Sequence, residues 1–86
     1  MSGIGWAVKH LNNRECVRRA GWNGKGMFLR LVPASCWDYG FDTISAGGMD
    51  RPERVPWVGM KTADNQFVPW LCSQTDLLAT DWELAD

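Results

Sequence analysis

Residues 18–33 read RRAGWNGKGMFLRLVP, and this stretch decides how the first half of the chain folds. Asn23 and Gly24 form a dipeptide that supplies the positive φ angles of a tight hairpin turn, and an apolar run follows it. We therefore expect one strand over residues 15–22 and a second over residues 27–32, joined by this turn. The indole ring of Trp22 would then lie at the end of the first strand, beside the turn and close to Arg18 and Arg19.

The segment before this hairpin predicts a helix over residues 3–12. Its apolar residues recur at the spacing i, i+3, i+4 and i+7, which aligns them on one helical face. The stripe consists of Ile4, Ala7, Val8 and Leu11. Ser2 is the expected N-cap, and the Asn12-Asn13 pair is the expected stop.

The segment after the hairpin begins with an irregular loop over residues 34–54, with a short strand near residues 39–44. Two further strands, 55–60 and 66–71, would form a second hairpin that turns at residues 63–65. Each contains a proline, which lacks a backbone N–H and so belongs at a sheet edge or a strand end.

The C-terminal part predicts a short helix and a last strand. Ser73 and Asp76 have the spacing of a capping box, which favours a helix over residues 74–80, and a strand over residues 81–84 would follow. The expected fold class is α+β: a small antiparallel β-sheet of four to five strands with an N-terminal helix and a short C-terminal helix.

The composition favours one small domain over residues 1–86, and a core this small favours self-association. No apolar run is long enough to span a membrane, and no secretory signal is visible, so we expect a soluble intracellular protein. Three widely spaced cysteines and one histidine match neither a disulfide framework nor a zinc site. We expect plain thiols, no metal and no cofactor.

Charge is unevenly distributed, although the net charge is only −1. Residues 9–30 hold six basic residues against Glu15, whereas residues 74–86 hold four acidic residues and no cation. Either the two segments face one another, within a chain or across subunits, or the basic segment holds a local anion site. The low net charge argues against binding to nucleic acid polymers.

The six tryptophans are the outlier, because a domain of 86 residues can use only two or three as core. Trp22 precedes the turn residues Asn23 and Gly24, so its ring could stack on a flat base while turn N–H groups hold polar atoms. Trp70 lies just before a helix N-terminus, which attracts anions. The alternative for both rings is a place in the core.

Catalytic patterns are scarce. Asp76 and Asp81 could act as an acid and a base, but a helix cap and a helix-end turn are the favoured interpretation of these two residues. The spacing of GWNGKG fits neither a dinucleotide fingerprint nor a P-loop. We therefore expect a protein that binds and does not catalyse.

Several of these segments together resemble one known family. RAGWNGKGMFLRLVP (residues 19–33), MKTADNQFVPWLCSQTDLLATDWEL (residues 60–84) and the N-terminal helix are similar to the Thoeris anti-defence two family of small phage and prophage proteins. The resemblance implies a sponge that binds cyclic ADP-ribose isomers from TIR-domain immune proteins, without turnover. Some relatives also hold cyclic dinucleotides. It further implies a homotetramer with pockets at subunit boundaries, in the cytoplasm of an infected bacterium.

The resemblance also implies roles for residues of this chain. Trp22 would stack on adenine, with Asn23 and Gly24 contacting the base or ribose. The neighbouring wall would be formed by Trp70, Leu71 and Ser73. Either Asp76 or Asp81 would accept from a ribose hydroxyl, and Trp57 would add an aromatic face. Charge alone, and not the family motif, suggests Arg18 and Arg19 for phosphate.

Two other classes of function stay open at this point. One is a phage interaction module whose tryptophans only make subunit contacts. The other is a small nucleotide hydrolase that uses Asp76 or Asp81. Residues 35–54 depart from the family pattern, and we expect this loop to tune the choice of ligand.

Overall fold

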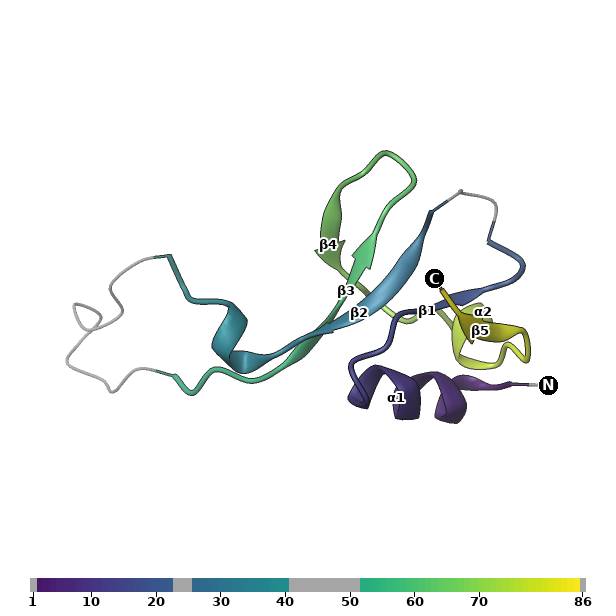
Figure 1. Ribbon diagram of the computed structural model, residues 1–86, viewed down its shortest axis with the longest axis horizontal. Coiled ribbons are helices and arrows are strands. Elements are labelled where there is room, and N and C mark those ends of the chain that lie inside the picture. The colour runs from purple at the N-terminus through teal and green to yellow at the C-terminus, as the bar shows by residue number, and fades with distance from the viewer. Residues whose placement is uncertain (1, 23–25, 41–51, 86) are drawn as a thin grey trace.

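The computed structural model describes residues 2–22, 26–40 and 52–85, and these form a five-stranded antiparallel sheet with helices beside it (Figure 1). The strand order is β4-β3-β2-β1-β5. The strands are β1 (Val17–Arg19), β2 (Phe28–Val32), β3 (Trp57–Lys61), β4 (Phe67–Pro69) and β5 (Trp82–Leu84). The helices are α1 (Ile4–Asn12), the 3-10 turn η1 (Ala34–Cys36) and α2 (Gln74–Leu77). The predicted α+β fold class is confirmed.

Helix α1 packs against β1, β2 and β5, and the core lies at this contact. Its buried residues are Ala7, Leu11, Val17, Leu29 and Trp82. The apolar stripe therefore faces the sheet as predicted, except that Val8 is 47% exposed. The predicted N-cap is wrong: Gly3 is the N-cap, and the backbone of Ser2 instead pairs with the start of β5, where Trp82 N donates to Ser2 O at 3.0 Å.

The pairing registers separate the two faces of the sheet. Val17 is aligned with Leu29, and Leu29 with Met60, so these side chains share the face that α1 covers. The alternate positions on β3 and β4 face the other way. There the rings of Trp57 and Phe67 lie 6.1 Å apart above Gly59.

Strand β1 is shorter than the predicted range 15–22, because it ends at Arg19, and it pairs with β2 in the antiparallel sense. The ladder with β2 has one aligned pair, Val17 with Leu29, whereas three aligned pairs join β1 to β5. After Arg19 the chain leaves the sheet through a turn that is closed by Trp22 N, which donates to Arg19 O at 3.2 Å. Ala20 N still donates to Asp81 O, in register with the β1–β5 ladder, and Gly21 N donates to the side-chain Oδ2 of Asp81. The Asn-Gly turn itself lies outside the described residues.

The second hairpin is confirmed, with strands of five and three residues that are shifted slightly from the predicted ranges. Its turn is closed by Thr62, whose amide donates to Gln66 O at 2.8 Å and whose hydroxyl donates to Asp64. Asn65 adopts the left-handed conformation, with φ of 65°. Pro69 is the last residue of edge strand β4, as expected of a residue without an N–H.

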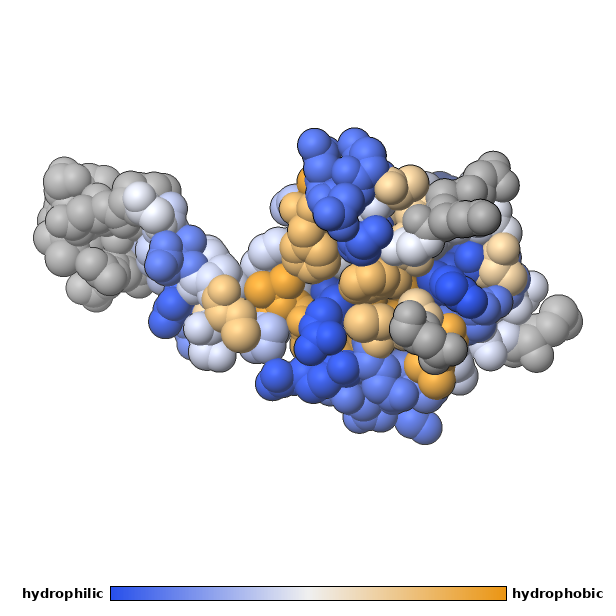
Figure 2. Space-filling model, turned by 45° about the horizontal axis from the view of Figure 1, so that its top comes forward, coloured by the Kyte–Doolittle hydropathy of each residue, from blue (hydrophilic) through white to orange (hydrophobic). Residues whose placement is uncertain are grey.

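Beyond the core, β2 and β3 continue as an arm that carries η1 away from α1 and β5 (Figure 1). Trp37 Nε1 donates to Val55 O at 2.9 Å, which ties the two sides of the arm together. Apolar residues gather at the centre of the face in Figure 2, where the arm leaves the body, whereas the tip of the β3–β4 hairpin is hydrophilic. The short strand predicted near residues 39–44 does not form at residues 39–40, and residues 41–44 lie outside the described part.

Candidate functional site

Three tryptophans meet where β5, α2 and the end of β1 converge. Trp82 is 3% exposed and forms the floor of this cluster. Trp22 meets it edge to face with ring centroids 5.5 Å apart, and Trp70 meets it in the same manner at 6.0 Å. Trp22 and Trp70 are only half-buried, so each packs on the core through part of its ring and keeps the remainder accessible. Part of the Trp22 ring therefore packs on the core, as one alternative expected, and stacking of this ring on a base stays a prediction.

Arg19 lies at the centre of the charges around these rings. Its Nη1 donates to Asp76 Oδ1 at 2.8 Å, and its Nε donates to Asp81 Oδ1 at 2.8 Å. One guanidinium therefore joins the end of β1 to α2 and to the residue before β5. On the opposite face of β1, Arg18 forms an ion pair with Glu83 at 3.0 Å.

The hydrogen bonds around Arg19 shift the pKa values of the groups that make them. The bond to Asp81, followed by the bond to Asp76, raises the pKa of Arg19 above its ordinary value. The bond from Arg19 is also the largest influence on Asp81, and it lowers the pKa of that carboxyl. Arg19 is therefore cationic and Asp81 anionic at neutral pH.

The basic and acidic segments of the sequence are joined by these contacts. The prediction that they face one another is confirmed within a single chain, because Arg18 and Arg19 both pair with acids from residues 74–86. The alternative was a local anion site in the basic segment. In the structure, both of these arginines already form ion pairs with carboxylates of the same chain. Whether either one also contacts a phosphate stays a prediction.

Helix α2 positions Asp76 at this cluster. Ser73 caps the helix, and its hydroxyl accepts from Asp76 N at 3.1 Å, which confirms one half of the predicted capping box. The carboxylate of Asp76 does not complete the box. It accepts instead from Arg19 and, at 3.5 Å, from Trp22 Nε1, while its backbone oxygen accepts from Trp82 Nε1 at 3.2 Å. The helix ends at Leu77, three residues earlier than predicted.

The structure brings some of the predicted ligand residues together and separates others. Around one tryptophan floor lie Trp22, Trp70, Asp76, Asp81 and Arg19. Leu71 and Ser73 adjoin this cluster along the chain and are exposed. Trp57 and Arg18 lie on the opposite face of the sheet within one chain. Asn23 and Gly24 lie outside the described residues.

The sequence analysis missed Trp82 as a member of this site. Its register position on β5 places it opposite Arg19 on β1, and its ring supports both accessible tryptophans. A pattern of three residues, Trp-Glu-Leu, cannot distinguish a buried ring from an exposed one. The available signal was a second tryptophan twelve residues after Trp70 and six after Asp76, on a segment rich in acids.

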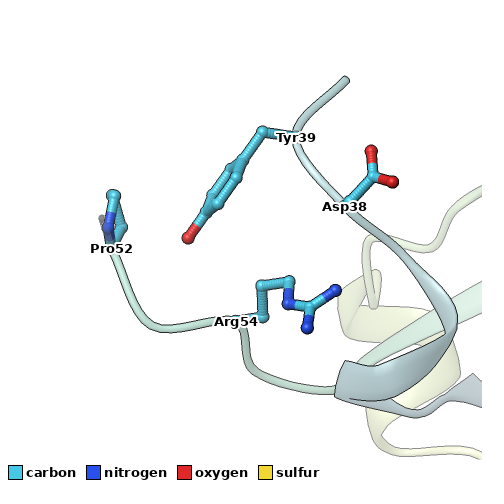
Figure 3. Close-up of a pocket in the computed structure, with 4 residues that line it drawn as sticks. All are labelled: Asp38, Tyr39, Pro52 and Arg54. Atoms are coloured by element: carbon cyan, nitrogen blue, oxygen red, sulfur yellow. The ribbon is translucent and has the colours of Figure 1, made fainter. Parts of the chain in front are cut away.

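A separate hollow of about 290 Å³ lies at the end of the arm (Figure 3). Asp38 and Tyr39 line it from one side of the arm, and Pro52 and Arg54 from the other. Arg54 Nη1 donates to Trp37 O at 2.6 Å, which fixes this side chain across the arm. Its lining contains none of the predicted ligand residues, and residues 41–51 of the adjoining loop lie outside the described part.

Two further features concern metal-ligand clusters and membrane-spanning helices among the described residues. Among residues 2–22, 26–40 and 52–85, no three His, Cys, Asp or Glu side chains come together in a way that could hold a metal ion. The same ranges contain no helix with the length and apolar character needed to cross a membrane.

The fold and the sequence together define the class of protein. Residues 2–85 match the model of the Thoeris anti-defense 2-like domain, so the chain belongs to this family of Thoeris anti-defence proteins. A curated relative is Thoeris anti-defense 2 of Bacillus phage SP01. It is 39% identical over 85 residues, which cover 94% of this chain and 91% of the relative. The family resemblance seen in the sequence is confirmed.

Proposed function

We propose that this protein counters Thoeris immunity by binding a cyclic nucleotide signal and holding it intact. The preferred ligand class is a glycocyclic ADP-ribose isomer, and cyclic dinucleotides are a second candidate class. One observation carries the proposal: Trp22 and Trp70 present accessible ring surface around a buried third tryptophan, next to oriented carboxylates. Aromatic rings stack on a base, which contributes about 1–3 kcal/mol per base in nucleic-acid complexes.

The polar groups at this cluster suit recognition better than catalysis. A hydrolase would need one carboxyl poised to give or take a proton near neutral pH. Asp76 and Asp81 instead share one guanidinium, and the pKa of Asp81 is lowered, away from that range. The nearby Cys72 thiol has a raised pKa, first through desolvation and then through Asp76, which disfavours the reactive thiolate. Fixed carboxylates remain good acceptors for ribose hydroxyls.

We further propose that the site is completed by a second copy of the chain within a homotetramer, in the cytoplasm of an infected bacterium. The segment that leads into and out of α2 adjoins this cluster and is exposed in the single chain. Leu71 is 90% exposed and Leu78 is 75% exposed on this segment. A pocket that encloses most of a ligand needs a further wall, and a neighbouring subunit could supply it.

The proposal is tested by uptake and release. The protein is incubated with a cyclic ADP-ribose isomer, free ligand is removed by filtration, and the protein is then denatured by heat. Intact ligand in the heat-released fraction supports sequestration. Degraded ligand identifies an enzyme, and an undepleted solution identifies an interaction module that does not bind the signal.

The substitution Trp22→Ala tests the role of the ring at this site. We expect it to abolish uptake while the oligomer and the fold persist, because Trp22 is half-buried and Trp82 still fills the floor. The matched control is Trp6→Ala, which removes another half-buried ring, stacked on His10 at 4.3 Å on α1. Unfolding or loss of the oligomer in Trp22→Ala alone would make this ring structural. If Trp22→Ala takes up as much ligand as the Trp6→Ala control and the wild type, Trp22 is not part of the ligand site.

A further inference from the structure

Arg19 makes intramolecular contacts that an arginine would not need if its only role were to bind a phosphate. Its guanidinium donates to Asp76 and Asp81, both at 2.8 Å, and its side chain is only 18% exposed. The two carboxylates come from segments more than fifty residues further along the chain. Such paired, charge-assisted hydrogen bonds fix the geometry of planar groups more strongly than neutral ones do.

Each of these two contacts leads to Trp22. Asp81 also accepts from Gly21 N at 2.9 Å through its other oxygen, which fixes the backbone immediately before the tryptophan. Asp76 Oδ1 also accepts a long hydrogen bond from Trp22 Nε1 at 3.5 Å, which is a weaker contact to the indole ring itself. In addition, Trp22 N donates to Arg19 O at 3.2 Å. Both the backbone and the ring of Trp22 are therefore tied to groups that Arg19 holds.

The charge at this cluster argues against a direct phosphate contact by Arg19. One cation faces two carboxylates, so a phosphate that approached the guanidinium would also meet Asp76 and Asp81. Both acids have less than half of their side-chain surface exposed, so water screens them incompletely.

We propose that Arg19 is a positioning residue that holds the ring of Trp22 in the orientation needed to stack on the base of the ligand. This inference rests on the proposed function, and it replaces the phosphate role that charge alone suggested for Arg19. The residue acts through Asp76 and Asp81 and does not touch the ligand.

A double-mutant cycle distinguishes the two roles. Affinity for a cyclic ADP-ribose isomer is measured by calorimetry for the wild type, Arg19→Gln, Trp22→Leu and the double variant, at ligand concentrations high enough to detect the weak binding that filtration misses. We expect Arg19→Gln to weaken binding about tenfold, because a misoriented ring loses part of its stacking energy. In the Trp22→Leu background, the same substitution should cost less than about twofold, since no ring remains to be oriented. Losses that multiply would overturn the proposal in favour of a direct contact.

A measurement without ligand keeps the inference separate from the proposed function. The protein is labelled with fluorotryptophan, and each ¹⁹F resonance is assigned by substitution. Arg19→Gln should shift or broaden the Trp22 resonance and leave that of Trp57, on the opposite face, unchanged. Arg30→Gln is the matched control, because it removes an exposed arginine whose side chain approaches Cys16 Sγ and not a carboxylate. An unchanged Trp22 resonance in Arg19→Gln would overturn the inference.

Arg19→Lys covers the case in which Arg19→Gln does not fold. A lysine keeps the charge but cannot reproduce the forked geometry, so it should hold one carboxylate and give an intermediate Trp22 shift. A Lys variant with the wild-type resonance and wild-type affinity would argue that charge alone matters, and would overturn the positioning role. If the wild type takes up no ligand, the proposed function fails while the fluorine experiment still tests the orientation of Trp22.

Discussion

Among the glycines that the structure describes, Gly59 is the one at which an added methyl group would meet the closest neighbours. A Cβ built there would clash with the ring of Phe67 and would lie 3.1 Å from Trp57 Cζ3. We expect Gly59→Ala to lower the free energy of unfolding by about 1–3 kcal/mol, since an overpacked site forces its neighbours to move. Urea denaturation measures this loss.

Two comparisons make the Gly59 prediction specific. Gly5 on α1 has no atom within 4 Å of its added Cβ, so Gly5→Ala should raise the free energy of unfolding by up to about 1 kcal/mol. In a Phe67→Ala background, most of the cost of Gly59→Ala should vanish, because the clashing ring is gone. A full cost in that background would show that the ring is not the cause.

At the scale of elements, we expect the ion pair between the end of β1 and the residue before β5 to make the free energy of unfolding depend on pH in the acid range. Asp81 has a pKa below its ordinary value of 3.8, chiefly because of its hydrogen bond from Arg19. Its contribution to stability is therefore fully present above that value, and it is lost as pH falls through the lowered pKa. We expect the free energy of unfolding to fall as the pH drops below the ordinary carboxyl pKa of 3.8, and to fall less steeply in Asp81→Asn. Equal slopes in urea titrations would contradict this assignment.

Helix α2 offers a second test at this scale, because its four residues depend on one cap. Ser73→Ala removes the hydroxyl that accepts from Asp76 N, and such losses cost about 1 kcal/mol. Local unfolding should be affected most, so amide hydrogen exchange should accelerate at Asp76 and remain unchanged at Leu29 in β2. Similar acceleration at both amides would mean that α2 unfolds only with the whole domain.

The elements that follow from local pattern were the ones predicted well from the sequence. The stripe of α1, the turn of the β3–β4 hairpin and the cap of α2 each depend on residues close together in the chain. The end of β1 was not predicted, because the side chain that accepts from the Gly21 amide belongs to Asp81, which is sixty residues further along the chain. The family resemblance indicated Trp22 and Trp70, but no local signal could show that Trp82 lies beneath them.

At the scale of the whole molecule, exposed apolar side chains adjoin the candidate site. Single exposed leucines are common on monomers. Leu71 and Leu78, however, are 90% and 75% exposed on the short segment that also carries Trp70 and Asp76. Each buried leucine contributes about 1.5–3 kcal/mol, so covering both would supply a useful part of the energy of a subunit contact. A neighbouring chain that covered these two leucines would also form a further wall of the candidate site.

The double substitution Leu71→Asn with Leu78→Asn tests whether this segment lies at the subunit contact. Both side chains face solvent in the single chain, so the folded protomer should keep its circular dichroism and lose little stability. We expect sedimentation velocity to show smaller species at micromolar protein, and ligand uptake to fall with the oligomer. The matched control, Val8→Asn on α1, removes a side chain that is 47% exposed and should leave both properties unchanged. An unaltered oligomer in the double variant would place the contact elsewhere, and the face where Trp57 and Phe67 lie above Gly59 would be substituted next.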